Sequence, residues 1–321
     1  MSDTRPTLLQ ALGICLEEYE YPHTVEFLPI TSDLQPLKMA YMDIPPDKEP
    51  NGKTVVLFHG KAFGCYYFRN VIEALTGAGY RVVAPDQIGW GKSPKPDIHY
   101  SFQLLAANTA ALLDHLGITD VAVLGHSTAG MTATRFALTY PDRVTHLVLE
   151  DPLGLADYRT GIPPQSEETL YDHEIHWTDP AVIRGYVKGY FVHPEPKIWE
   201  PLADVLVRVT LSPDYHRWAR SAALTFQMIY QQPVRYEYQR LAPAVLLITG
   251  ADDHTVPLGQ YASPAEAARL GDFTALSAAA AQDIPHAKRV VIPDCGHIPH
   301  LEYPNQFLAE LPSCASCPTK R

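Results

Sequence analysis

The chain has 321 residues, of which 46% are hydrophobic and 19% are charged, the balance of a globular protein that can bury a large core. Its formal net charge of −11, with 14 histidines counted as neutral, argues against an electrostatic hold on nucleic acid or on an anionic membrane. No apolar run approaches the roughly 20 residues that a membrane span needs. We therefore expect no nucleic-acid partner and no membrane partner, and the composition sets no oligomeric state.

The two ends of the chain carry weak signals. The apolar stretch Leu8–Leu16 is followed by Glu17 and Glu18 in place of a small-residue cleavage site, which favours an amphipathic first helix over a signal peptide. The five cysteines are odd in number and scattered, a pattern that favours reduced thiols and a cytoplasmic protein. Cys314 and Cys317 form a CxxC without a second ligand pair, so we expect a frayed terminus there and no zinc site.

Short apolar runs rich in Val, Leu and Ile alternate with helix-like stretches, which is the pattern of a parallel sheet covered on both faces. Two extended segments, near Thr24–Leu28 and Leu37–Met42, predict a leading hairpin at the edge of that sheet. The clearest later strands are expected at Thr54–Phe58, Arg81–Ala84, Val121–Leu124, Val144–Leu149, Val245–Thr249 and Arg289–Ile292.

The helices between these strands carry start and stop signals. Ser101 is placed to cap a helix with a leucine stripe, and Gly117 is placed to end it. A second helix is expected to begin at Ser127, directly after a strand, and to run to about Tyr140, where Pro141 ends it.

The alternation stops between Pro152 and about Arg240. Roughly 90 residues is too long for a structureless loop in a compact domain, so this stretch must hold helices of its own. Asp179 and Pro180 offer an N-cap followed by proline at the first helical position, and apolar residues then recur at helical spacing. We predict a helical cap over residues 152–240, inserted into a core formed by residues 1–151 and 241–321, and a smaller helical insertion over about residues 258–288.

The decisive segment runs from Val121 to Gly130, an apolar strand followed by a sharp turn and a helix. A serine on such a turn projects its hydroxyl above the carboxyl end of the strand, and crowding demands small residues two positions before and after it. Gly125 and Ala129 meet that demand around Ser127, although the common form of the motif has glycine at both places. The segment alone fits either an activated serine nucleophile or a serine that only caps a helix, and its companions in the chain favour the nucleophile.

Three companions to this turn lie at the ends of other strands. His59-Gly60-Lys61 follows an early strand, and the backbone N–H of Lys61 can join that of Thr128 in an oxyanion hole. Asp253 lies on a loop after a later strand, and His297 follows the last strand, which gives the chain order Ser, Asp, His. We predict Ser127 as nucleophile, His297 as general base and Asp253 as the acid that orients the base.

Two other carboxylates could serve as that acid. Asp151 follows the strand at residues 144–149, and Asp252 is the neighbour of Asp253. We favour Asp253 over both.

Together these residues resemble the α/β-hydrolase superfamily, in its branch of capped esterase-like and C–C-hydrolase-like enzymes. The resemblance covers about residues 37–311. The matching residues are His59-Gly60, Asp86-Gln-Ile-Gly-Trp-Gly-Lys-Ser93, Gly125-His-Ser127, Asp253 with Pro257, and Gly296-His297. It implies a mostly parallel eight-stranded sheet with helices on both faces and an inserted helical cap, together with the roles given above for Ser127, Asp253 and His297.

We expect a carboxylic ester hydrolase or lactonase that acts on a hydrophobic or aromatic small molecule through an acyl-enzyme, because this chemistry needs nothing beyond the triad, and we expect no metal and no organic cofactor. A C–C hydrolase or an acyltransferase on the same triad is the alternative, and a ligand receptor that kept the fold is the non-enzymatic one. Epoxide hydrolases and haloalkane dehalogenases of this fold use an aspartate nucleophile, so Ser127 argues against both. We interpret His59, His126 and Asp86 as structural residues that shape neighbouring loops.

The cap supplies the aromatic side chains that we expect around the substrate. Nine large residues are candidates, and some must form the core of the cap itself. Those chosen as substrate contacts are Trp177, Tyr186, Tyr190, Trp199 and Met228; the others are Phe191, Trp218, Phe226 and Tyr230. Lys61 is unusual beside an oxyanion site, and we expect its side chain to be solvated or ion-paired, with a role as a substrate ligand as the alternative.

Overall fold

A single twisted sheet of eight strands organises the protein. The computed structural model describes residues 9–315. The strands are β1(Glu26–Ser32), β2(Gln35–Ile44), β3(Thr54–Phe58), β4(Arg81–Pro85), β5(Val121–His126), β6(Val144–Glu150), β7(Ala244–Gly250) and β8(Ala287–Ile292). Their order across the sheet is β1-β2-β4-β3-β5-β6-β7-β8. The hairpin β1–β2 and the pair β2–β4 are antiparallel, and every later pair is parallel. The predicted fold class is confirmed.

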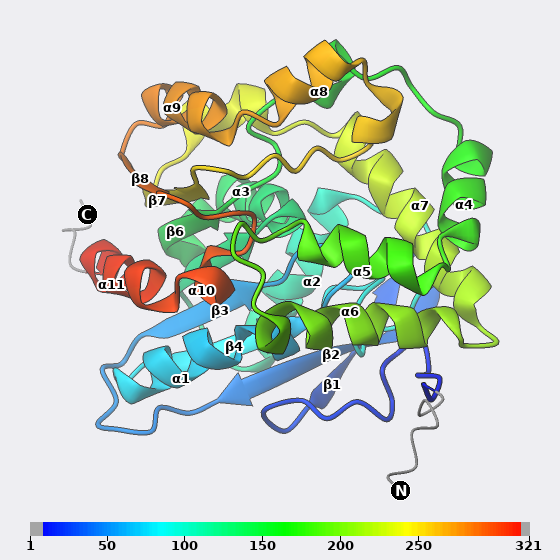
Figure 1. Ribbon diagram of the computed structural model, residues 1–321. Coiled ribbons are helices and arrows are strands. Elements are labelled where there is room, and N and C mark those ends of the chain that lie inside the picture. Colours follow the sequence, from blue (N-terminus) through cyan, green and yellow to red (C-terminus); the bar gives the residue numbers. More distant parts are fainter. Residues whose placement is uncertain (1–8, 316–321) are drawn as a thin grey trace, which may run out of the picture.

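Helices cover both faces of this sheet (Figure 1). They are α1(Arg69–Gly77), α2(Phe102–His115), α3(Thr128–Thr139), α4(Glu167–His176), α5(Pro180–Lys188), α6(Pro196–Thr210), α7(Tyr215–Gln231), α8(Pro264–Leu270), α9(Phe273–Asp283), α10(Pro299–Glu302) and α11(Pro304–Ala315). Helices α2, α3 and α9 pack on one face of the sheet, and α1 and α11 pack on the other. None of the described helices is long and apolar enough to cross a membrane.

The strands are apolar on both sides because both faces of the sheet are covered. In β3, Val56 and Phe58 pack on the side of α2 and α3, while Val55 and Leu57 pack on the opposite side with α1. Because the later strands are parallel, their carboxyl ends lie at the same edge of the sheet. The polar groups that follow these strands meet at that edge.

Four helices, α4 to α7, lie between β6 and β7, inside the stretch where the sequence predicts a cap. They pack as two pairs, α4 with α7 and α5 with α6, and they gather on the right of the view in Figure 1. The predicted N-cap of α5 is confirmed, because the Asp179 side chain accepts a hydrogen bond of 2.8 Å from the Ala181 N–H. The Ser101 cap of α2 is confirmed in the same way, with the Leu104 N–H as donor at 3.0 Å.

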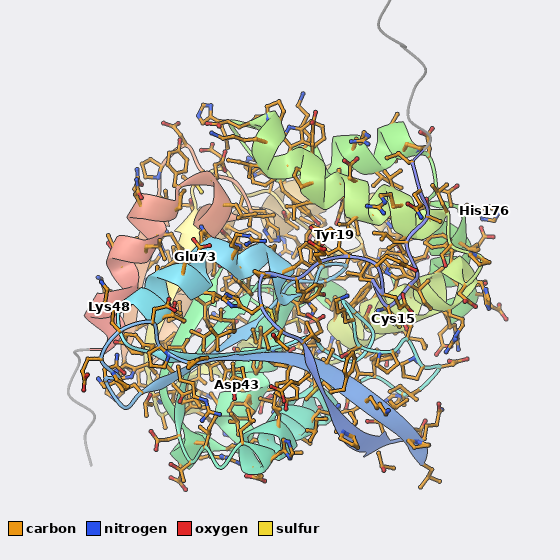
Figure 2. The ribbon with its side chains drawn as sticks, turned by 90° about the horizontal axis from the view of Figure 1, so that it is seen from below. Cys15, Tyr19, Asp43, Lys48, Glu73 and His176 are labelled. Atoms are coloured by element: carbon orange, nitrogen blue, oxygen red, sulfur yellow. The ribbon has the colours of Figure 1, made fainter. Side chains whose placement is uncertain are left out.

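The expected first helix is absent from the described part of the N-terminal stretch. Residues 9–20 contain short turns at residues 14–15 and 17–18 and no helix, and Figure 2 labels Cys15 and Tyr19 of this segment. Leu12, Ile14 and Leu16 are buried while the residues between them are more exposed. This period of two fits an extended or turning segment and not a helix, and the backbone N–H of Leu12 donates to the Arg208 carbonyl of α6 at 3.1 Å.

At the other end of the chain, α11 runs to Ala315. All of Cys317 and the side chain of Cys314 lie outside the described residues, so the expectation for this CxxC is not addressed.

Candidate active site

Ser127 occupies a strained turn between β5 and α3. Its backbone has φ +57° and ψ −126°, a region that residues other than glycine rarely adopt. A residue held in this region costs about 1–3 kcal/mol of strain. The turn is crowded on the side of Gly125, where an added Cβ would lie 2.4 Å from the Ala129 carbonyl oxygen. Ala129 itself is buried in the core cluster, so the motif tolerates alanine at that place and requires glycine at residue 125.

Ser127, His297 and Asp253 form one hydrogen-bonded line. The Ser127 hydroxyl and His297 Nε2 are 2.8 Å apart, and His297 Nδ1 is 2.7 Å from Asp253 Oδ2. Because a carboxylate only accepts, the proton on the imidazole lies on Nδ1, and Nε2 is free to accept from the serine. All three side chains are buried. The structure thus brings together the three residues that the sequence predicts.

The electrostatic setting of Asp253 favours its ionised form. Burial acts to raise its pKa, but the facing His297 and the Thr255 N–H, which donates to Oδ1 at 2.8 Å, outweigh burial and hold the pKa below its usual value. The carboxylate therefore has an acceptor oxygen for each of two fixed donors.

The alternative acid Asp151 interacts with Asp253 and does not reach the imidazole. Its two carboxylate oxygens accept from the Gly250 N–H at 3.0 and 3.2 Å, and the side chain is fully buried. Burial and then the charge of Asp253 raise the pKa of Asp151 well above its usual value, which favours its neutral form. Asp252 is exposed, and its backbone N–H donates to the Cys295 carbonyl. Of the three candidate acids, Asp253 is the one in contact with the imidazole.

The predicted oxyanion residues lie against the serine. Gly60 packs so closely that an added Cβ would be 3.1 Å from the Ser127 Cβ, and Lys61 follows it in the same turn. Thr128 is the first residue of α3, where backbone N–H groups have no partner within the helix. Among the described residues, neither the Lys61 nor the Thr128 N–H donates to another protein group. Both amides are therefore available to a negative oxygen.

A second buried line of hydrogen bonds joins the loops of the site. The Gly60 N–H donates to the Tyr67 hydroxyl at 2.7 Å, and that hydroxyl is 2.8 Å from His126 Nδ1. His126 Nε2 in turn donates to the His297 carbonyl at 2.7 Å. Burial lowers the pKa of His126 to about 3, so the ring is neutral and has the one donor and one acceptor that this line needs. The sequence indicated a structural His126 but did not reveal Tyr67.

A cavity of about 530 Å³ opens above Ser127 and His297, between the sheet and the helices α4 to α7, which are called the insertion from here on. Of the five predicted substrate contacts, Trp177, Tyr186 and Tyr190 line it. Trp218 and Phe226 of α7, which belong to the wider set of nine candidates, line it as well.

Trp199 and Met228 do not line the cavity, so the prediction was wrong for these two residues. Trp199 of α6 is buried in an apolar cluster, with its ring centroid 6.0 Å from Nζ of Lys188 at the end of α5. Met228 is two residues from Phe226 on α7, about 200° around the helix, and faces the core on the side of α2. Helical spacing identified the apolar faces but not which face each helix turns to the cavity.

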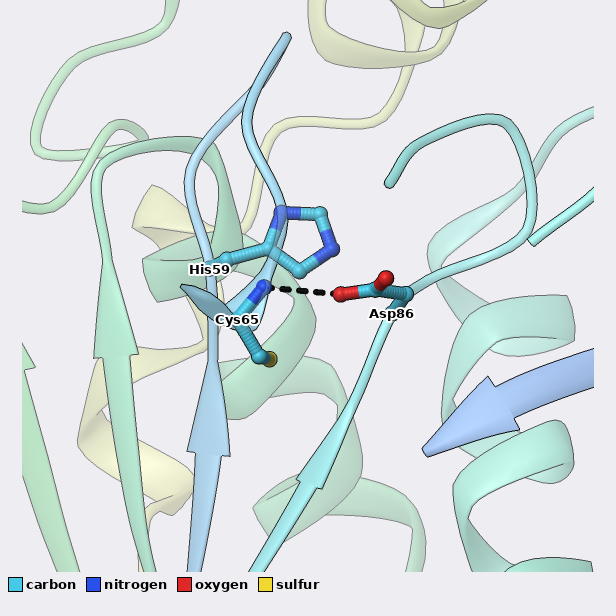
Figure 3. Close-up of side chains that lie close together, drawn as sticks. All are labelled: His59, Cys65 and Asp86. Carbon is cyan, nitrogen blue, oxygen red and sulfur yellow. Dashed lines mark hydrogen bonds between the residues drawn. The ribbon is translucent and has the colours of Figure 1, made fainter. Parts of the chain in front are cut away.

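Among the described residues, one cluster of potential metal ligands is His59, Cys65 and Asp86, which lie close together below the oxyanion turn (Figure 3). Protein groups already occupy its ligand atoms. The two ring nitrogens of His59 contact the Gly60 carbonyl and the Gln87 N–H. The Asp86 oxygens accept from the Cys65 N–H, the Tyr21 hydroxyl and the Lys92 N–H.

Burial also raises the pKa of the Cys65 thiol well above its usual value, which disfavours the thiolate that binds metal. We interpret the cluster as a support for two turns.

Comparison with known proteins agrees with this fold. Residues 53–200 match a family model described as alpha/beta hydrolase fold. The crystal structure of a probable hydrolytic enzyme from Pseudomonas aeruginosa is 39% identical, with a TM-score of 0.92, over 95% of this chain and 98% of that one.

Two curated relatives are enzymes. A haloalkane dehalogenase from Mycolicibacterium paratuberculosis is 37% identical over 149 residues, 45% of this chain and 48% of that protein. The chain thus spans about half the length of this relative. A 2-hydroxy-6-oxo-2,4-heptadienoate hydrolase from Pseudomonas putida is 27% identical over 64% of this chain and 74% of that protein.

Proposed function

We propose, since the chain belongs to the α/β-hydrolase superfamily, that it is a serine hydrolase that cleaves a carboxylic ester or lactone of a small aromatic or hydrophobic molecule. The observation that carries this proposal is the hydrogen-bonded line from the Ser127 hydroxyl through His297 to Asp253. Residues 1–151 and 241–321 would form the catalytic core, and residues 152–240 the cap over it.

The geometry supports a two-step acyl transfer. His297 Nε2 accepts the proton of Ser127 as its oxygen attacks the substrate carbonyl carbon. The N–H groups of Lys61 and Thr128 stabilise the resulting oxyanion, and one such donor contributes about 3 kcal/mol to the transition state. The protonated imidazole then gives its proton to the leaving alcohol, and a water molecule activated by the same ring releases the acid.

The nucleophile argues against dehalogenation, despite the similarity to a haloalkane dehalogenase. A carboxylate that displaces a halide forms an ester, which water can hydrolyse at its carbonyl carbon. A serine that displaces a halide would form an ether, which has no carbonyl carbon for water to attack. Ser127 therefore supports acyl chemistry and excludes turnover by this route.

Cleavage of a carbon–carbon bond next to a ketone is the second candidate, because the same acyl-enzyme would form and a carbanion would leave in place of an alcohol. The similarity to the heptadienoate hydrolase, over 74% of its length, favours this candidate over an acyltransferase. Product analysis separates the reactions, since an ester gives an acid and an alcohol whereas a diketone gives an acid and a ketone.

The proposal is tested by labelling and turnover together. A fluorophosphonate probe should label the native chain at Ser127, and a panel of p-nitrophenyl esters and lactones should be hydrolysed. Ser127→Ala should lose both properties, whereas Ser263→Ala, which removes a helix-capping hydroxyl outside the cavity, should keep both. A native chain that is folded, unlabelled and inactive on every member of the panel would point to a receptor.

A further inference from the structure

A buried ion pair forms part of the wall of the cavity beside Ser127. Lys61 Nζ lies 3.7 Å from Glu174 Oε2, and the two side chains are 16% and 5% exposed. Lys61 comes from the turn after β3 and Glu174 from α4 of the insertion, so the pair connects the core to the cap. Both residues line the same cavity as Ser127 and His297.

The ammonium of this pair is incompletely satisfied. Among the described residues Glu174 is the acidic partner of Lys61, and its oxygen at 3.7 Å is beyond ordinary hydrogen-bonding distance. Its other close neighbours are the ring of Phe226, 3.8 Å from Nζ to the centroid, and that of Trp90 at 5.2 Å. Aromatic faces stabilise the charge but do not satisfy three N–H donors. The ammonium can therefore donate to one more polar group in the cavity.

The charge balance of the wall favours a neutral group over an anionic one. Lys61 and Glu174 cancel, so a carboxylate placed between them would leave an uncompensated negative charge in a buried position. Asp252 and Asp253 line the same cavity and add to the repulsion. A hydroxyl or a primary amide carries no charge, and it can accept from the ammonium and donate to the carboxylate at once.

We propose that Lys61 and Glu174 select substrates that carry a hydroxyl or amide group on an otherwise aromatic or apolar body. This inference rests on the proposed function, because it places the substrate in the cavity of Ser127. The pair then determines substrate specificity. Lys61 has two roles, because its backbone N–H faces the oxyanion and its side chain binds the hydroxyl or amide group of the substrate.

The experiment compares substrates that differ in one substituent. Methyl esters of 3-phenylpropanoic acid are made with a methyl, a hydroxyl or a carboxylate group on the ring. Acetate esters of 2-phenylethanol with the same three groups present them from the alcohol side. In the native chain, kcat/KM should be about tenfold higher for the hydroxyl than for the methyl compound of at least one series, and lowest for the carboxylate.

Two variants of the pair should shift these ratios in different directions. Lys61→Met should bring the hydroxyl-to-methyl ratio to within about twofold of one, because the donor is lost. Glu174→Gln leaves the ammonium uncompensated, so it should raise the carboxylate-to-methyl ratio about tenfold. Damage to the fold would lower the rates for all three substituents together and leave the ratios unchanged.

The exposed pair Lys197 and Glu195, with a distance of 2.8 Å, supplies matched controls outside the cavity. Lys197→Met and Glu195→Gln change the net charge of the chain by the same amounts and should leave every ratio as it is in the native chain.

The inference is overturned if both cavity variants keep ratios within twofold of the native values in both series. In that case the proposed function still stands, provided that hydrolysis depends on Ser127. If no ester and no lactone of the panel is hydrolysed, the proposed function fails separately. Calorimetric binding of the intact esters to Ser127→Ala then decides the inference. Preference for the hydroxyl compound that is lost in Ser127→Ala/Lys61→Met supports it, and equal binding of the methyl and hydroxyl compounds overturns it.

Discussion

Replacing Asp253 with asparagine tests the proposed relay at its most informative point. In the native chain Oδ1 accepts from the Thr255 N–H at 2.8 Å, and Oδ2 faces His297 Nδ1 at 2.7 Å. Asparagine has one acceptor oxygen, which the fixed Thr255 amide would occupy. Its NH₂ group would then face Nδ1 and force the imidazole proton onto Nε2, the nitrogen that must accept from Ser127.

The size of the effect follows from the charge that is removed. Two unit charges about 4 Å apart interact by about 4 kcal/mol at an effective dielectric constant near 20. An imidazolium that forms next to a neutral amide loses this stabilisation, which corresponds to a decrease of about 10³-fold in rate. The wrong tautomer adds to that decrease, so we expect kcat of Asp253→Asn to fall by about 10³- to 10⁴-fold.

Asp151→Asn supplies the matched comparison. Its amide oxygen can still accept from the Gly250 N–H, and Asp151 does not contact His297, so kcat should stay within about fivefold of the native value. Turnover of a p-nitrophenyl ester and the rate of fluorophosphonate labelling measure both variants, and thermal unfolding checks that each is folded. An active Asp253→Asn together with an inactive Asp151→Asn would move the acid to Asp151 and refute the tautomer argument.

Three further predictions concern the buried groups around the site. Tyr67→Phe leaves the Gly60 N–H and His126 Nδ1 without partners, so urea titration should show a loss of about 2–4 kcal/mol, and kcat should fall with little change in KM because the oxyanion turn loosens. Burial lowers the pKa of His126 from 6.5 to about 3, so as the pH falls the unfolded chain binds this proton before the folded chain does. Between pH 6.5 and about 3 the free energy of unfolding should therefore fall by about 1.4 kcal/mol per pH unit. A series of urea titrations measures this slope, and His126→Asn should remove its contribution. Gly125→Ala places a Cβ 2.4 Å from the Ala129 carbonyl oxygen, so the variant should be destabilised by about 2 kcal/mol or more and lose fluorophosphonate labelling, and native-like melting and labelling would contradict the crowding argument.

The parts of the site that depend on local sequence could be predicted. A strand, a small residue, a serine and a helix are neighbours in the chain, so the segment around Ser127 carries its own structural signal. The same holds for the strands, whose apolar runs are bounded by polar turns, and for the caps at Ser101 and Asp179. These features depend on hydrogen bonds and burial over a few residues.

The parts that depend on packing between distant segments could not be predicted. Tyr67 contacts His126, 59 residues away, and nothing near Tyr67 in the sequence marks that partner. Trp199 and Trp218 both sit on apolar helix faces, but only the pairing of α4 with α7 and of α5 with α6 decides which tryptophan meets the cavity. Leu12, Ile14 and Leu16 recur at every second residue, a spacing that was present in the sequence but was overlooked when the stretch was interpreted as one apolar run.

The residues between β6 and β7 help to build the site as well as to line its cavity. The His297 backbone N–H donates at 2.7 Å to the carbonyl of Tyr190, which follows α5, and the two rings lie 5.0 Å apart. This contact explains the glycine before the histidine, because a Cβ on Gly296 would lie 2.2 Å from the same Tyr190 oxygen. Parallel strands bring their loops to one edge of a sheet, but they do not align an imidazole to a hydroxyl within tenths of an ångström. That alignment depends on hydrogen bonds between loops, here from the insertion on one side of His297 and from His126 on the other. Any displacement of the segment after α5 would therefore move the backbone of the proposed base.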